Sequence, residues 1–277
     1  MIDAQKSSGS HQNGEGGLKR HFGYNLAQLL ATKLEQASPD FKVQPYLAQA
    51  SQITWPELEL KARTTAHAHL LAQYLPPDYP AALNVLTRIM GPENPKETGM
   101  FTNWYWLGPV STFILHYGPQ HPAHFEASLR AIAELTKRNT GEYAIRPFIE
   151  AWPQATLTQL QEWAHSDNFH LRRLASEGLR PRLPWAPKLS VFIADPAPVL
   201  PILETLRDDP VKFVQKSVAN HLNDYLKDNP DWAWQVLETW GASPDITPAR
   251  RWIIKHALRN ELKRDNTRAH ELLKMAE

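Results

Sequence analysis

The sequence predicts an all-α fold in which helix pairs stack into a curved solenoid. From Leu58 onward, apolar residues recur at the spacing of amphipathic helices, and the helical segments end at Pro, Gly or Asn-Pro. The alternation of apolar and polar residues that is typical of strands is nearly absent. Three of the segments also share one pattern at a nearly constant period. A chain of 277 residues, 42% of them hydrophobic, is long enough to bury the core of such a fold.

The chain begins with a polar leader and continues as one predicted domain. Residues 1–18 contain the run Gly-Glu-Gly-Gly at 14–17 and few apolar residues, so we expect this leader to be disordered. Residues 19–277 are predicted to form a single helical-repeat domain. The predicted helices span 57–75, 79–90, 104–117, 121–138, 156–165, 211–227, 231–240 and 248–262. Segment 189–194 lies between prolines and is the best strand candidate, but a short buried helix fits it equally well.

Three segments repeat the same arrangement of aliphatic residues. They begin at Leu171, Val214 and Ile254, which lie 43 and 40 residues apart, and each has aliphatic residues at i, i+4 and i+8. This spacing falls within the roughly 40 to 47 residues of HEAT-type repeats. In such repeats the helix pairs stack side by side and the second helices line a concave groove, since a single pair cannot bury its apolar face alone.

Each repeat has a polar stripe on the helix face opposite to its aliphatic residues. The stripes consist of Arg173, Ser176, Glu177 and Arg180 in the first repeat, Lys216, Asn220, Asn223 and Asp224 in the second, and His256, Asn260, Lys263 and Arg264 in the third. We therefore expect a concave groove that is polar and mainly basic, with isolated acids inside it.

Basic residues gather in two segments, although the net charge of the chain is only +1. Segment 168–190 has a local balance of +4, and segment 250–264 has a balance of +5. The average field of the protein does not attract nucleic acid, so any affinity for it has to come from these two segments.

The composition excludes several classes of protein. With no cysteine, the chain has no disulfide framework, no thiolate nucleophile and no cysteine-based zinc site. Glycine is scarce, with 12 residues, and its one cluster follows no strand, which argues against a phosphate-binding loop. No apolar run is long enough to span a membrane, and the N-terminus lacks the apolar middle of a signal peptide. We expect a cytoplasmic protein that does not bind membranes.

The histidines do not indicate a metal site. His67 and His69 are two residues apart and cannot share a helix face, and the histidines at 116, 121 and 124 have no carboxylate at ligand spacing. We therefore expect no metal.

Two glutamates, one aspartate and one tryptophan are the candidates for chemistry. Glu177 is flanked by arginines, which favour its charged form, although a surface ion pair would explain this spacing too. The prolines around Trp185 stiffen a loop that presents an aromatic ring beside Glu177, whereas core packing is the ordinary role of a tryptophan. Glu142 opens a helix, where a glutamate also compensates the helix dipole, and Asp224 also fits a local cap.

These residues lie in segments that closely resemble a known family. Segment 171–185 (LRRLASEGLRPRLPW), segment 142–148 (EYAIRPF) and segment 217–224 (SVANHLND) are similar to those of the HEAT-like-repeat DNA alkylation-repair glycosylases, and are closer to the AlkC branch than to the AlkD branch. The resemblance covers roughly residues 20 to 270. Some members of the AlkC branch append an immunoglobulin-like domain, for which this chain ends too soon.

The resemblance implies a fold and an activity. The fold is a right-handed superhelical solenoid with a concave basic groove. The activity is that of a monofunctional DNA glycosylase, which excises cationic alkylated bases of the 3-methyladenine class and leaves an abasic site. No cofactor or metal is implied. The partner is double-stranded DNA that carries alkylated bases, bound by a monomer. Two alternatives remain open, namely a non-catalytic DNA-binding protein of this fold and a scaffold for protein partners.

The resemblance also implies roles for individual residues. Glu142 and Glu177 correspond to the catalytic carboxylates, Asp224 is a further candidate, and Trp185 corresponds to the aromatic residue that faces the lesion. We expect the basic and polar side chains of the repeats to contact DNA phosphates. These are Arg172, Arg173, Arg180, Arg182, Lys216, Asn220, Lys255, Arg259 and Lys263.

Overall fold

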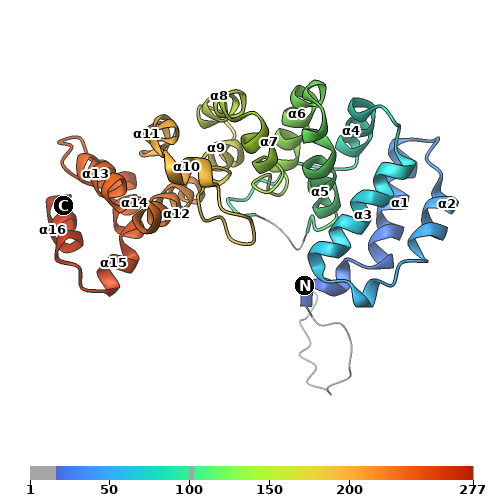
Figure 1. Cartoon of the computed structure of the whole chain (residues 1–277), viewed down its shortest axis with the longest axis horizontal. Coiled ribbons are helices and arrows are strands. Elements are labelled where there is room, and N and C mark those ends of the chain that lie inside the picture. The colour runs from blue at the N-terminus through green and yellow to red at the C-terminus, as the bar shows by residue number, and fades with distance from the viewer. Residues whose placement is uncertain (1–16, 100–102, 277) are drawn as a thin grey trace, which may run out of the picture.

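A computed structural model describes residues 17–99 and 103–276, and within these ranges every regular element is a helix (Figure 1). The α-helices are α1 (Tyr24–Ala37), α2 (Val43–Ala50), α3 (Leu60–Tyr74), α4 (Tyr79–Arg88), α5 (Leu107–Tyr117), α6 (Phe125–Thr136), α7 (Arg146–Ala151), α8 (Pro153–Ala164), α9 (Phe169–Glu177), α10 (Ser190–Ala194), α11 (Leu200–Leu206), α12 (Lys212–Asp228), α13 (Pro230–Gly241), α14 (Pro248–Ala257), α15 (Arg259–Lys263) and α16 (Thr267–Met275). The short 3-10 helices are η1 (Gly17–His21), η2 (Trp55–Glu57), η3 (Gly118–Gln120), η4 (Pro122–His124) and η5 (Ala197–Val199).

The helices follow one another along an arc, from α1 and α2 at one end to α16 at the other (Figure 1). Each helix packs on its near neighbours in the chain: α3 on α5, α6 on α9, α9 on α12, and α12 on α14. A second set of contacts joins α8 to α9 and to α11, and α13 to α12 and to α14. Contacts of this nearest-neighbour kind define a helical-repeat solenoid, so the predicted all-α repeat fold is confirmed.

The three segments that share the aliphatic pattern are consecutive inner elements of this stack. Their pattern begins in α9, α12 and α14, and the first two aliphatic residues of each repeat are buried. Because α12 packs on both α9 and α14, its apolar positions are covered from both sides. The period of about 40 residues in the sequence is therefore the distance along the chain from one stacked helix to the next.

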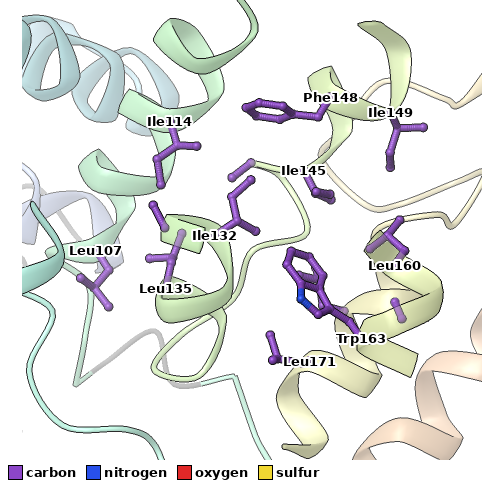
Figure 2. Close-up of a cluster of buried hydrophobic side chains, with 14 of the residues drawn as sticks. Leu107, Ile114, Ile132, Leu135, Ile145, Phe148, Ile149, Leu160, Trp163 and Leu171 are labelled. Carbon is purple, nitrogen blue, oxygen red and sulfur yellow. The ribbon is translucent and has the colours of Figure 1, made fainter. Parts of the chain in front are cut away.

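The core is continuous from one repeat to the next. Figure 2 shows buried side chains from α5, α6, α7, α8 and α9 that converge around the segment between α6 and α7. The labelled members are Leu107, Ile114, Ile132, Leu135, Ile145, Phe148, Ile149, Leu160, Trp163 and Leu171. Burial of Ile145 fixes the chain three residues after Glu142, so the core holds the backbone that carries this carboxylate.

Cap residues and prolines set the starts of several helices. Asn168 caps α9 by accepting a 3.0 Å hydrogen bond from the backbone N–H of His170, and Thr247 caps α14 in the same way through Arg250. Proline occupies the first turn of α8, α13 and α14, where its missing N–H costs nothing. The start of α9 matters most, since it fixes the register in which that helix presents its polar residues.

The observed helix boundaries differ from the predicted ones where 3-10 turns intervene. The helices predicted at 57–75 and 121–138 begin at Leu60 and Phe125, after η2 and η4, because Pro56 and Pro122 favour tight turns there. The helix predicted at 248–262 is divided at Leu258 into α14 and α15. Segment 189–194 contains the short helix α10, so the helical alternative is correct. Two further helices, α1 and α2, precede Leu58, where the prediction began.

Other expectations concern the termini and the membrane. Residues 1–16 of the predicted leader lie outside the described residues, and Gly17 and Leu18 belong to η1. In the ranges that the structure describes, no helix is both long enough and apolar enough to cross a bilayer. The same ranges contain no group of three or more His, Asp or Glu side chains placed to hold a metal ion.

Candidate functional site

Three carboxylates and two arginines form an alternating row that runs from the turn before α7, through α9 and the residues after it, to α12. Arg173 of α9 contacts Glu142 at 2.8 Å and Glu177 at 3.2 Å. Arg180, which follows α9, contacts Glu177 at 2.8 Å and Asp224 of α12 at 2.9 Å. The order of the row is therefore Glu142, Arg173, Glu177, Arg180 and Asp224. All five residues were candidates in the sequence, and the structure brings them together; we call them the charged row.

Local geometry explains how α9 supplies the middle of the charged row. Arg173 and Glu177 are i, i+4 neighbours on one helix face, and Arg180 follows Glu177 by three residues. Gly178 lies so close to the preceding repeat that a Cβ atom there would be 2.8 Å from Ile145 Cγ2. This close approach brings the end of α9 against the segment that carries Glu142.

Two hydroxyl groups complete the hydrogen bonding of the charged row. Ser217 of α12 donates a 2.6 Å hydrogen bond to Oε2 of Glu177, whose Oε1 accepts from Arg180. Arg173 donates from Nη1 to Thr140 Oγ1 at 3.1 Å, in addition to its bond to Glu142. Both oxygens of Glu177 therefore have partners, which holds this carboxylate in one orientation.

The carboxylates of the charged row are buried and have different pKa shifts. Burial opposes the ionisation of Glu177, but the charges of Arg173 and Arg180 and the hydrogen bonds from Ser217 and Arg180 outweigh it and lower its pKa. Burial raises the pKa of Glu142, Arg173 offsets this only in part, and Glu177 adds repulsion. Burial also raises the pKa of Asp224 despite its contact with Arg180. Glu177 is thus the fixed negative charge, and its two neighbours bind protons more readily.

Trp185 lies on the loop between α9 and α10 and presents its ring to solvent. Its side chain is 92% exposed, and its backbone φ is +67°. A bulky residue in this left-handed region is strained, at a cost of about 1 to 3 kcal/mol. Such strain persists only where the surroundings impose the conformation, so the loop must be held on both sides of Trp185.

Two residues that the sequence analysis did not single out hold this loop. Arg146 donates to the carbonyl oxygens of Gly178 at 3.2 Å, of Arg180 at 2.9 Å and of Pro187. Tyr143 donates from its hydroxyl to the carbonyl oxygen of Pro184 at 3.2 Å. Both lie in the segment 142–148, but no local pattern indicates that a buried arginine bonds to carbonyl groups more than 30 residues away.

The pKa values around the loop reflect its proximity to the charged row. Burial raises the pKa of Tyr143 to about 12, and the negative charges of Glu142 and Glu177 add to the shift. Since Tyr143 also bonds to the residue before Trp185, it links the backbone of this loop to the surroundings of the charged row.

Arg172 and Arg182, which are also predicted to contact DNA, are in ion pairs. Arg172 bonds to Asp209 at 2.6 Å, and Arg182 bonds to Asp228 at 2.7 and 2.6 Å. Arg172 also donates to the backbone of the turn before α9, at Ser166. Contact of these arginines with DNA stays a prediction.

The remaining predicted DNA contacts lie on α12, α14 and α15. Lys216, Lys255 and Lys263 are exposed, whereas Asn220 and Arg259 are partly buried. Within residues 17–99 and 103–276, none of the three lysines has a carboxylate oxygen within 4 Å. These three lysines are therefore free to pair with phosphate.

Several residues of the expected open stripes are buried between repeats instead. Ser176 is fully buried against His221, with 3.4 Å between Oγ and Nδ1. Asn223 donates to the carbonyl oxygen of Ala257 at 2.6 Å and accepts from Asn260 at 3.0 Å. The helical period places these residues on the polar face, but α12 packs on α9 and on α14 and therefore covers part of that face.

Comparisons with known proteins place the chain among DNA repair enzymes. Residues 122–260 match the family model described as "DNA alkylation repair enzyme". The chain is 36% identical over 252 residues to YhaZ of Bacillus subtilis, a protein described as uncharacterized; the match covers 91% of this chain and 66% of YhaZ, or about two thirds of its length. Among solved structures, it is similar to the Pseudomonas fluorescens alkylpurine DNA glycosylase AlkC bound to DNA containing an abasic site analog. The TM-score is 0.80 and the identity 35%, and the match covers 94% of this chain and 69% of the AlkC chain.

Proposed function

Because the chain belongs to the DNA alkylation repair enzyme family, we propose that it is a DNA glycosylase that excises cationic alkylated bases of the 3-methyladenine class. The charged row is the observation that carries this proposal. It concentrates three carboxylates and two guanidinium groups in a buried site, and an exposed tryptophan lies on the strained loop that follows α9. The similarity to an alkylpurine DNA glycosylase supports the same activity.

The chemistry of an alkylated purine matches what the charged row offers. A purine alkylated at N3 is already cationic and leaves without protonation by a general acid, so the enzyme has to stabilise the positive charge that develops on the sugar. Fixed negative charges in a site shielded from water do this well, because they require little reorganisation. Glu177, oriented through both of its oxygens, would supply that charge.

The hydrolytic step needs a group that accepts a proton from the attacking water. Glu142 and Asp224, whose pKa values burial raises, are better bases than Glu177. We assign this role to one of these two carboxylates, which flank Glu177 in the row. The five residues of the row include no lysine that could form a Schiff base with the sugar, which favours a monofunctional hydrolase.

Trp185 would recognise the charge of the damaged base. An exposed indole face attracts a cation by about 0.5 to 2 kcal/mol, and the same face gives a neutral base no such advantage. The exposed lysines of α12, α14 and α15 would bind phosphates of the duplex on a concave basic surface, with little dependence on sequence.

Release of free bases from methylated duplex DNA tests the proposal directly. Genomic DNA treated with a methylating agent is incubated with the protein, and the soluble bases are separated and quantified. We expect 3-methyladenine to be released while uracil stays in a matched uracil-containing duplex, because a neutral leaving group needs protonation. Tight DNA binding without release of any base would instead indicate a non-catalytic DNA-binding protein, and absence of both would favour a scaffold for protein partners.

A further inference from the structure

Four basic side chains from three helices, His256 among them, gather near the C-terminal end of the arc. Lys212 and Lys216 lie on α12, His256 on α14 and Arg259 on α15; we call these four residues the His256 cluster. Lys212 Nζ lies 3.3 Å from the ring centroid of Trp252, and this ring stacks on the His256 imidazole at 4.6 Å. Arg259 donates to the backbone carbonyl of His256 at 2.7 Å.

The helical spacing places the two lysines of α12 opposite Trp252 and His256 of α14. Lys212 and Lys216 are i, i+4 neighbours, as are Trp252 and His256, and α12 packs directly on α14. The first lysine therefore lies on the tryptophan, and the second faces the histidine. Both lysines are exposed and the imidazole is partly exposed, so the His256 cluster is open to a ligand.

The charges that act on His256 in the described part of the chain are all positive. They come from Arg259, Lys216 and Lys212, and together with burial, which is the largest cause, they lower the pKa of His256. Three acids of the elements that pack against α14 form ion pairs elsewhere: Glu238 of α13 with Arg268 of α16, Glu261 of α15 with Arg264, and Asp228 of α12 with Arg182.

Asp224 is the one acid that acts on the His256 cluster, and it acts on Arg259 from within the charged row, where it also contacts Arg180. The lysines and the imidazole are left without a negative partner among the described residues. Cations that lie close together without a negative partner repel one another, and a bound anion stabilises them.

We propose that the His256 cluster is a binding site for a DNA phosphate group, and that His256 takes up a proton when the phosphate binds. This inference rests on the proposed function, since it takes DNA as the ligand. The bound anion offsets the repulsion among the four basic groups, so protonation of the imidazole adds a further favourable charge pair. DNA affinity then rises as the pH falls, because the complex holds more protons than the free protein.

The position of the His256 cluster separates it from the reacting sugar. Lys216 and Asp224 are eight residues apart on α12, which corresponds to about 12 Å along the helix axis. A phosphate at His256 therefore belongs to a neighbouring nucleotide, and the site contributes to the grip on DNA and not to bond cleavage.

Isothermal titration calorimetry of DNA binding tests the proposal. The probe is a short duplex with a tetrahydrofuran abasic-site analogue, titrated between pH 6 and pH 8 in buffers of different ionisation enthalpy. For the wild-type protein we expect net proton uptake and an affinity that is higher at pH 6 than at pH 8. Each unit by which binding raises the pKa of His256 increases the affinity by at most about tenfold, a limit reached only below both pKa values. His256→Asn should remove the uptake and most of the pH dependence. His165→Asn, at an exposed histidine after α8, is the matched control and should behave as wild type.

Two further measurements keep the result interpretable. Lys212→Ala should weaken binding at every pH and reduce proton uptake, since it removes part of the repulsion that holds His256 neutral. Single-turnover base release at saturating enzyme, measured on the same variants, separates bond cleavage from DNA binding. Unchanged proton uptake in His256→Asn would overturn the proposal. If the wild-type protein released no bases but still bound DNA more tightly at low pH, the proposed function would be wrong and the phosphate site would be supported.

Discussion

The hydroxyl group of Ser217 donates a 2.6 Å hydrogen bond to Oε2 of Glu177, across the interface between α12 and α9. This contact joins two successive repeats at the centre of the charged row. It also lowers the pKa of Glu177, together with the charges of Arg173 and Arg180. The packing of one repeat on the next therefore helps to keep this carboxylate ionised.

Removal of the hydroxyl group should change the pH dependence of base release. Glu177 is active as the anion, so activity is lost as the pH falls through its pKa, and Ser217→Ala raises that pKa. We expect the acid limb of the single-turnover rate profile to move to higher pH, and Ser217→Thr to restore it. Ser128→Ala, which removes a buried hydroxyl bonded to Tyr79, is the control and should leave the limb in place. An unmoved limb in Ser217→Ala would show that Glu177 does not control the rate.

Neutralisation of the carboxylates should slow base release without loss of DNA affinity. Glu177→Gln and Glu142→Gln keep the size of the side chain. The first removes the charge that stabilises the sugar cation, and the second removes a neighbouring charge that is also a candidate base. Each should lower the rate by about 10² to 10³-fold, the scale of one lost electrostatic stabiliser. Binding should hold or tighten, because an acid beside phosphates repels DNA in the ground state. A parallel loss of affinity and rate would mean that the acids are structural partners of the arginines.

Trp185 should show opposite effects on stability and on activity. Asparagine adopts the left-handed region more readily than tryptophan, so Trp185→Asn should raise the free energy of unfolding by about 1 kcal/mol. The loss of the aromatic face should slow the release of 3-methyladenine by about tenfold. Urea denaturation and single-turnover rates measure the two effects. Trp185→Phe retains an aromatic face and should lose less activity; equal losses would argue against cation–π recognition.

The exposed lysines should govern the salt dependence of DNA binding. Lys216→Ala and Lys255→Ala should each reduce the slope of log K against log salt by about 0.9, the amount expected for one phosphate contact. Lys274→Ala, at an exposed lysine on α16, is the control for charge alone. Fluorescence anisotropy with an undamaged duplex at several salt concentrations gives the slopes. If the three variants had equal salt slopes, the duplex would not contact Lys216 or Lys255.

Two buried histidines should make the protein less stable in acid. Burial lowers the pKa of His67 to about 4 and that of His221 to about 3, whereas an unfolded histidine titrates near 6.5. Below pH 6.5 the unfolded state binds more protons than the folded state. Each histidine therefore lowers the free energy of unfolding by about 1.4 kcal/mol for every unit by which the pH decreases. His221→Phe, which keeps a ring stacked on Tyr225, should reduce this slope by one proton in urea titrations between pH 7 and pH 4.5. A slope equal to wild type would show that His221 is protonated in the folded protein.

The sequence by itself was sufficient for the fold class and for the candidate residues. Helical periodicity is a local property, so most of the helices from 57 onward and the repeat of about 40 residues could be read without the structure, although α11 and α16 lie outside the predicted ranges. The segments at 142–148, 171–185 and 217–224 likewise contain every carboxylate of the charged row. The helices before Leu58 were missed, and the boundaries moved by a few residues where prolines favour 3-10 turns.

Only the tertiary structure decided how these residues are used. The partner of Arg182 is Asp228, 46 residues away, and the partner of Arg172 is Asp209, 37 residues away. Which arginines pair with acids and which basic residues stay free depends on how one repeat stacks on the next, and helical spacing carries no information about this. The same stacking buries Glu142 and Asp224, which shifts their pKa values through the loss of solvation.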